Sequence, residues 1–263
     1  DLRLAEQAAR GRRYPQPVPL FLMASEATAG PIRAALGGRL DGRTVAVFEQ
    51  CVSLRLTPTG ELFRDERGEL SVYASGHGDL PDALRESGLL DAFIAERGAD
   101  ATLWLTNLDN LGATIDAELL GMHLTHGGEL SVEVVDKVGT DRGGIPIRHD
   151  GHPMIAEEFR LPPTFDPQSV RVFNTNTFIA SARALRDLSF EFTFVEVEKT
   201  VGAAKAVQFE RLLGEITVPL PARFVRVPRE GAGSRFLPVK DLDELERRRP
   251  EIEAVCRERG ILP

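Results

Sequence analysis

Continuous apolar runs mark the first half of the chain. Runs of strand length lie at residues 18–24, 44–48 and 101–106. An uninterrupted apolar run is typical of a strand in a parallel sheet, which is buried on both faces. Apolar positions elsewhere recur at helical spacing. They predict helices at residues 1–10, 28–36, 80–97, 114–124, 179–185 and 241–259.

The second half of the chain has a different pattern, in which apolar and polar residues alternate. This alternation predicts strands at residues 130–135, 145–148, 154–159, 170–173, 190–198 and 206–211. Short turns with Gly or Asp join them, which favours antiparallel hairpins. We interpret the whole as one three-layer α/β domain over residues 1–263, with a solvated outer helix within residues 241–263. A ligand is expected where the front strands end.

Composition narrows the classes of function. The 263 residues carry 40 acidic and 32 basic side chains, a net charge of −8, which argues against nucleic acid or an anionic membrane as the main partner. No apolar run approaches the roughly 20 residues that span a bilayer, and no signal segment opens the chain. Cys51 and Cys256 form no disulfide framework. We therefore expect a cytoplasmic protein.

Polar residues and glycines follow the second apolar run and precede the helix predicted from Leu80. The amide of Gln50 has the donors and the acceptor needed to read the edge of a base, although such a residue also caps turns. Gly76 and Gly78 would let the backbone approach a ligand, and His77 lies between them. Asp79 is expected to cap the helix whose N-terminus suits an anion. The alternative is a capped turn with an incidental His.

Two further groups of amides and carboxylates have the chemistry of a ligand site. Asn107, Asp109 and Asn110 follow the third apolar run, where a carboxylate among amides suits Mg²⁺ or a ribose hydroxyl. Such residues also form plain turns. Asn174 and Asn176 are two apart, so on a strand both side chains point the same way, toward the hydroxyls of a sugar or simply toward solvent.

Two lysines complete the set of candidate ligand-binding residues. The histidines, by contrast, do not indicate a zinc site. Lys137 precedes a Gly-Gly pair that contains Gly144, and Lys240 follows an apolar segment fixed by Pro. A cation held in this way can contact phosphate, although an ordinary surface Lys is the alternative. His123 and His126 share a helical face but have no evident third ligand, and no nucleophile motif is present.

Taken in order, these stretches resemble the eukaryotic-type UTP–glucose-1-phosphate uridylyltransferases, or UDP-glucose pyrophosphorylases. The resemblance runs through VPLFLMASEAT, FEQ, GHGD, NLDNLGA-ID, EVVDK-D-GG, E-F-LP, FNTN and RFLPVK. It implies a Rossmann-like nucleotide-diphospho-sugar transferase fold (GT-A-like) with a mixed central sheet and a hairpin-rich second half. The family's Gly-rich triphosphate loop should lie before Asp1 and its β-helix domain after Pro263, so we expect an N-terminally incomplete catalytic domain.

The resemblance also assigns roles and a reaction. It implies nucleotide binding by Gln50, Gly76, Gly78, Asn107 and Asp109, with Asp109 also on Mg²⁺; sugar binding by His77, Gly144, Glu157, Asn174 and Asn176; and catalytic phosphate contacts by Lys137 and above all Lys240. UTP and glucose 1-phosphate would give UDP-glucose and pyrophosphate. Since the attacking phosphate oxygen is already an anion, such a site needs positioning and positive charge rather than a general base.

Three alternatives accompany this interpretation. A sister enzyme for an N-acetylhexosamine is disfavoured by His77, because such enzymes resemble GNGG where this chain has GHGD. A broad-specificity UDP-sugar pyrophosphorylase stays open. So does a non-catalytic UDP-sugar-binding protein without the triphosphate loop. A monomer or a dimer is expected.

Overall fold

The computed structural model describes residues 2–12, 14, 16–98, 100–139 and 141–263. They gather into two compact units. The larger unit comprises residues 1–18, 99–185 and 214–263, and the smaller unit comprises residues 19–98 and 186–213. The expectation of a single domain stays a prediction. Among the described residues, no helix has both the length and the apolar character needed to cross a membrane.

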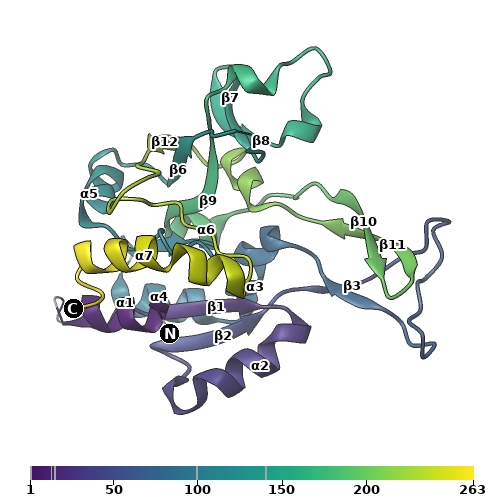
Figure 1. The fold of residues 1–263 in the computed structure, drawn as a ribbon, viewed down its shortest axis with the longest axis horizontal. Coiled ribbons are helices and arrows are strands. Elements are labelled where there is room, and N and C mark those ends of the chain that lie inside the picture. Colours follow the sequence, from purple (N-terminus) through teal and green to yellow (C-terminus); the bar gives the residue numbers. More distant parts are fainter. Residues whose placement is uncertain (1, 13, 15, 99, 140) are drawn as a thin grey trace. The chain divides into compact units, whose positions relative to one another are not determined.

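The smaller unit contains a parallel strand pair and two antiparallel ones (Figure 1). Its elements are β1 (Leu20–Ala24), α2 (Glu26–Leu36), η1 (Gly37–Arg39), β2 (Val45–Glu49), β3 (Val52–Leu54), β4 (Val72–Ala74), η2 (His77–Asp79), α3 (Leu80–Glu86), α4 (Leu89–Arg97), β10 (Val195–Val201) and β11 (Ala204–Glu210). β1 and β2 pair in parallel, as their apolar runs predict. Between them α2 begins at a capping box in which Ser25 and Thr28 each bond the other's backbone.

The single helix predicted over residues 80–97 is wrong, because the chain breaks in its middle. α3 ends at Glu86 and α4 begins at Leu89. Gly88 between them has φ 75°, a left-handed conformation that glycine adopts at little cost and that stops a helix. The apolar stripe continues across the break, which is why periodicity alone does not reveal it.

The larger unit is built on a mixed sheet with the order β12-β6-β9-β5. Its elements are α1 (Leu2–Gly11), β5 (Thr102–Leu105), α5 (Ala117–Thr125), β6 (Leu130–Asp136), β7 (Ile145–His149), β8 (His152–Ala156), η3 (Glu158–Arg160), η4 (Pro167–Ser169), β9 (Val172–Ser181), α6 (Ala182–Asp187), η5 (Leu213–Thr217), β12 (Ala222–Arg226) and α7 (Leu242–Glu258). β12 runs parallel to β6, whereas β9 is antiparallel to both β6 and β5. The predicted mixed sheet is confirmed.

Some of the strands predicted from the sequence are confirmed, and others differ in the structure. The hairpin β7–β8 is confirmed, as is the hairpin β10–β11 of the smaller unit. However, β9 runs through residues predicted to begin a helix at 179, and β12 was not predicted. β5 joins β9 in an antiparallel pair, although its apolar run suggested a parallel sheet. Such a run shows burial on both faces and does not show strand direction.

The outer helix α7 has a buried face in addition to its solvated one. Ile252, Val255 and Cys256 are 8%, 1% and 0% exposed and form an apolar cluster with Leu237. Leu2 of α1 packs against the same cluster. The two terminal helices therefore share one core with the segment that precedes α7.

A buried ion pair joins β6 to the segment before α7. Glu133 of β6 and Arg235 are 1% and 3% exposed. The Nε and Nη2 atoms of Arg235 donate to the two Glu133 oxygens, each at 2.6 Å, and Nη2 also donates to the Thr114 carbonyl at 2.8 Å. Burial raises the pKa of Glu133, while the Arg235 guanidinium opposes this shift. The two charges therefore compensate each other in a buried place.

Removing one charge of this pair should destabilise the fold strongly. Glu133→Gln leaves the guanidinium buried without its counter-ion, a change that costs roughly 3–5 kcal/mol. Urea unfolding measures the loss. Ser131→Ala is the matched control, because Ser131 lies on the same strand and loses a single buried hydrogen bond, to His123 at 2.9 Å, worth about 1 kcal/mol. Equal losses for the two variants would contradict the role of the buried charge.

Candidate functional site

Asp109 and Lys240 face each other in the larger unit. The Lys240 ammonium donates to Oδ2 of Asp109, and the two side chains are 67% and 33% exposed. Their backbones are joined as well: Val239 donates to the Asp109 carbonyl at 3.0 Å and Leu111 donates to the Leu237 carbonyl at 3.0 Å. The loop after β5 and the segment before α7 therefore present one exposed cation beside one carboxylate, the charges that the sequence analysis assigns to phosphate and metal.

A bulge in β9 links Asn174 to Asn176 and brings Asn176 to the loop after β5. The register between β6 and β9 shifts after Glu133, and Asn176 in the bulge has φ 58°, which is rare for a residue with a side chain. Asn176 donates from Nδ2 to the Asn107 side-chain oxygen at 2.7 Å, and its own N–H bonds the Asn174 side chain at 2.9 Å. The three predicted amides form one connected group.

Gly144 and Glu157 lie against each other. A Cβ atom added to Gly144 would meet the Ile155 side chain at 2.5 Å and the Glu157 carboxylate at 2.8 Å, so no larger residue fits. The Gly144 carbonyl accepts from the Asn174 N–H at 2.8 Å. Burial raises the pKa of Glu157, an effect that the charge of nearby Arg160 opposes. These contacts bring three of the predicted sugar-binding residues together: Gly144, Glu157 and Asn174.

Gly214 belongs to this group, although no sequence pattern marks it as a candidate site residue. An added Cβ would lie 3.0 Å from the Ile155 side chain and 3.9 Å from the Asn174 amide nitrogen. A lone glycine after a strand suggests only a turn. The close approach depends on packing against β8 and β9, which the sequence does not show.

Lys137 has a different environment from Lys240. Its side chain is 7% exposed, and the ammonium donates to Glu158 at 2.8 Å and to the Pro167 carbonyl at 3.2 Å. A phosphate would have to displace Glu158 to reach it. The catalytic role of Lys137 stays a prediction, and the geometry favours Lys240 as the available cation.

The smaller unit brings Gln50, His77 and the two glycines together. Gln50 donates to the Gly76 carbonyl at 2.8 Å. Nδ1 of His77 accepts from the Leu213 N–H at 2.9 Å, which leaves the proton on Nε2. Added Cβ atoms on Gly76 and Gly78 would each lie 2.6 Å from the backbone of Arg211. The glycines thus allow the chain's own backbone to pass closely, and their nucleotide role stays a prediction.

The expectation that Asp79 caps the following helix is wrong. Its side chain makes no capping bond. It is fully buried, accepting from Ser75 at 2.7 Å and from Nε of Arg211 at 2.6 Å. An arginine distant in sequence competes successfully for the carboxylate, because a charge-assisted bond is stronger than a bond to a backbone amide. Asp79 therefore fixes the turn that carries His77.

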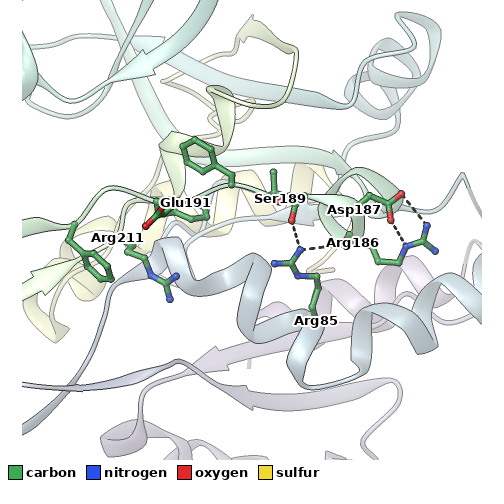
Figure 2. Close-up of a pocket in the computed structure, with 10 residues that line it drawn as sticks. Arg85, Arg186, Asp187, Ser189, Glu191 and Arg211 are labelled. Atoms are coloured by element: carbon green, nitrogen blue, oxygen red, sulfur yellow. Dashed lines mark hydrogen bonds and ion pairs between the residues drawn. The ribbon is translucent and has the colours of Figure 1, made fainter.

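The pocket drawn in Figure 2 has about 690 Å³ of space and lies in the smaller unit. None of the predicted site residues lines it. Its arginines already have partners: Arg186 bonds Asp187 at 2.8 Å (Figure 2), Arg211 bonds Asp82 at 3.0 Å, and Arg85 also bonds Asp82. With these charges neutralised, the pocket lacks the features of an anion site.

A magnesium ion suits the donors at Asp109. Among the described residues, no cluster of three or more His, Cys, Asp or Glu side chains could enclose a metal. Mg²⁺ does not require one, because it commonly binds one or two carboxylates and takes its other ligands from substrate phosphates and water. The half-buried Asp109 carboxylate fits that mode of binding.

The fold is that of the UDP-sugar pyrophosphorylases. The UDP-glucose phosphorylase of Trypanosoma brucei matches with a TM-score of 0.78 at 23% identity, over 93% of this chain and 57% of that one. A mutant of UDP-glucose pyrophosphorylase from Leishmania major, in complex with UDP-glucose, matches with a TM-score of 0.74 at 23% identity, over 93% of this chain and 58% of that one. The predicted α/β class with a mixed sheet is confirmed.

The chain belongs to the UTP–glucose-1-phosphate uridylyltransferase family, whose model matches residues 1–248. The enzyme of that name from Saccharomyces cerevisiae is 33% identical over 266 residues, covering 93% of this chain and 52% of its own length. The Encephalitozoon cuniculi enzyme is 29% identical over 257 residues, covering 93% of this chain and 50% of its own. The chain thus spans about half the length of these curated relatives.

His77 should make stability depend on pH in a defined direction. Burial lowers its pKa below 6.5, against the opposing charges of Glu210 and Asp79. The unfolded chain then binds more protons than the folded one, so this contribution to stability is present above about pH 6.5 and is lost as the pH falls. Urea unfolding between pH 7.5 and 5 should give a shallower pH dependence for His77→Asn, which keeps an acceptor but does not titrate.

His149→Asn is the control for this experiment, because the His149 side chain is 73% exposed. It should follow the wild-type profile. A His77→Asn profile as steep as that of wild type would show that His77 is not the titrating group.

Proposed function

We propose that this protein transfers a uridylyl group: UTP and glucose 1-phosphate give UDP-glucose and pyrophosphate, reversibly. The observation that carries the proposal is the joined pair of loops that presents Lys240 and Asp109 next to the linked amides of Asn107 and Asn176. This arrangement offers charge for phosphates and hydrogen bonds for sugar hydroxyls. The names of the curated relatives from yeast and Encephalitozoon support the same reaction.

The proposed chemistry needs no nucleophile or base from the protein. A phosphate oxygen of glucose 1-phosphate attacks the α-phosphorus of UTP, the new O–P bond forms, and the bond to the β-phosphate breaks to release pyrophosphate. Lys240 would neutralise phosphate charge that grows in this step. Asp109 would hold Mg²⁺, which supplies further positive charge when bound. The protein's own contribution is therefore alignment and electrostatics.

The remaining residues would recognise the two substrates. Asn174 and Asn176 would offer amides, and Glu157 a carboxylate, to glucose hydroxyls, and Gly144, which packs against Glu157, would line the same site. In the smaller unit, Gln50 would read the uracil edge, and Nε2 of His77 would donate to a sugar-phosphate oxygen. We also propose that the protein is a monomer or dimer. The free thiols of Cys51 and Cys256 support a reducing, cytoplasmic compartment.

Lys240→Ala should lower kcat for UTP-dependent pyrophosphate release by about 10²–10³, the usual effect of removing one group that stabilises transition-state charge. The assay contains glucose 1-phosphate and Mg²⁺. Lys205→Ala is a close control, since Lys205 is also 67% exposed and is paired with Glu198. Near-normal turnover of Lys240→Ala would reject its role. A folded wild type that binds UDP-glucose without turnover would instead identify a UDP-sugar-binding protein.

Asn174→Ala should raise the KM for glucose 1-phosphate about tenfold while changing the KM for UTP less than twofold, because a lost hydrogen bond to a sugar hydroxyl costs about 1–1.5 kcal/mol. Galactose 1-phosphate and N-acetylglucosamine 1-phosphate, assayed in parallel, report whether the site accepts other sugars. Equal effects on both substrates would count against a sugar-facing Asn174.

A further inference from the structure

Asn110 follows Asp109 in the loop after β5, and its side chain bonds the segment that carries Lys240. It is 2% exposed. Its Nδ2 donates to the Arg235 carbonyl at 3.1 Å, and its Oδ1 accepts from the Leu237 N–H at 2.9 Å. One side chain thus holds two backbone groups of the opposite segment, and both bonds are buried.

These side-chain bonds replace backbone bonds that the loop cannot make. The Asn110 N–H is used by the Asn107 carbonyl at 3.2 Å, and the Asn110 carbonyl accepts from Arg3 at 2.5 Å. Further along the same pair of segments, Leu111 bonds Leu237 through the backbone. Without the Asn110 amide, the Arg235 carbonyl and the Leu237 N–H would lose their partners in a buried place.

Close contact leaves the two segments little freedom to slide. A Cβ added to Gly112 would lie 2.8 Å from the Arg235 carbonyl carbon and 2.9 Å from the Phe236 nitrogen. The segments are therefore backbone against backbone at this point. Beyond it, Lys240 makes two hydrogen bonds within the described part of the chain: its N–H donates to Glu244 at 2.9 Å, and its ammonium donates to Asp109. The position of Lys240 consequently follows from the register of the segment before it.

We propose that Asn110 is a positioning residue: its amide sets the register of residues 235–240 against the loop, and so holds the Lys240 ammonium at Asp109. The inference deepens the proposed uridylyl transfer and rests on it for its catalytic consequence. Its structural part concerns only where the Lys240 ammonium lies. That part can be measured without turnover.

Acetylation of lysine side chains tests the structural part directly. The folded protein is treated briefly with an acetylating reagent, and the rates at Lys240 and Lys205 are read by peptide mass spectrometry. Lys205 is the internal reference, because both side chains are 67% exposed and paired with a carboxylate. Asp109→Asn, which removes the partner, sets the maximal rate at Lys240. Asn110→Ala should raise the ratio of Lys240 to Lys205 labelling at least threefold, toward that maximum.

Two further variants keep the test decisive. Asn110→Asp retains the acceptor for Leu237 and loses the donor to Arg235, so its labelling ratio should lie between wild type and Asn110→Ala; it also serves if the alanine variant does not fold. Ser131→Ala loses a buried hydrogen bond outside these segments, and it should destabilise the protein without changing the ratio. An unchanged ratio in both folded Asn110 variants would overturn the proposal. So would an equal rise in Ser131→Ala.

Kinetics then test the catalytic consequence. Asn110→Ala should lower kcat about 10- to 100-fold, as misplacement of a charged group by about 1 Å does, while the KM for UTP changes less than threefold. Altered labelling with unaltered kcat would overturn the role in catalysis. If wild type shows no turnover at all, the proposed uridylyl transfer fails, whereas the labelling ratio still decides whether Asn110 positions Lys240.

Discussion

Buried carbonyl groups in the loop after β5 impose the constraint on which the larger unit depends. This irregular loop makes few backbone bonds of its own, and a buried carbonyl without a donor is costly. Arginines supply the donors: Arg3 to Asn110 and Ala113, Arg259 to Gly112, Arg235 to Thr114 and Arg10 to Ile115, at 2.5–2.8 Å. They come from α1, from the end of α7 and from the segment before α7. The loop that carries Asp109 therefore requires both terminal regions.

The arginines around this loop repel one another, and neighbouring acidic side chains offset the repulsion. Burial, together with the charge of Arg235, lowers the pKa of Arg259 to about 10. Glu133 pairs with Arg235, and Glu6 pairs with Arg3 at 3.0 Å while also accepting from the Ile115 N–H at 2.6 Å. Each carboxylate offsets the charge of one arginine, and Glu6 in addition provides an acceptor for a backbone N–H of the loop. Losing one acid would leave several cations facing one another, so the network acts as a unit.

Sequence patterns predicted what depends on nearby residues and missed what depends on distant ones. Apolar runs located β1, β2 and β5, and alternation located the hairpins β7–β8 and β10–β11. The bulge that turns Asn176 arises where β9 meets β6, and no local pattern specifies such a register shift. Asp79 looked like a cap because Arg211 is far away in sequence. The family resemblance supplied the candidate site residues, whereas the buried contacts of Asn110 and the close packing of Gly214 became visible only in the tertiary structure.

The candidate site combines an exposed ion pair, which can exchange partners, with buried contacts that hold the backbone in place. Lys240 and Asp109 meet in a largely exposed pair, which contributes only about 0–1 kcal/mol and which phosphate or a metal can separate easily. Beneath them the bonds of Asn110, Arg235 and Glu133 are buried, where breaking one bond leaves an unsatisfied group. A weak pair on a strongly held platform can change partners without moving its backbone. A fixed backbone matters for phosphate chemistry, because the cation must already be in place when negative charge develops in the transition state.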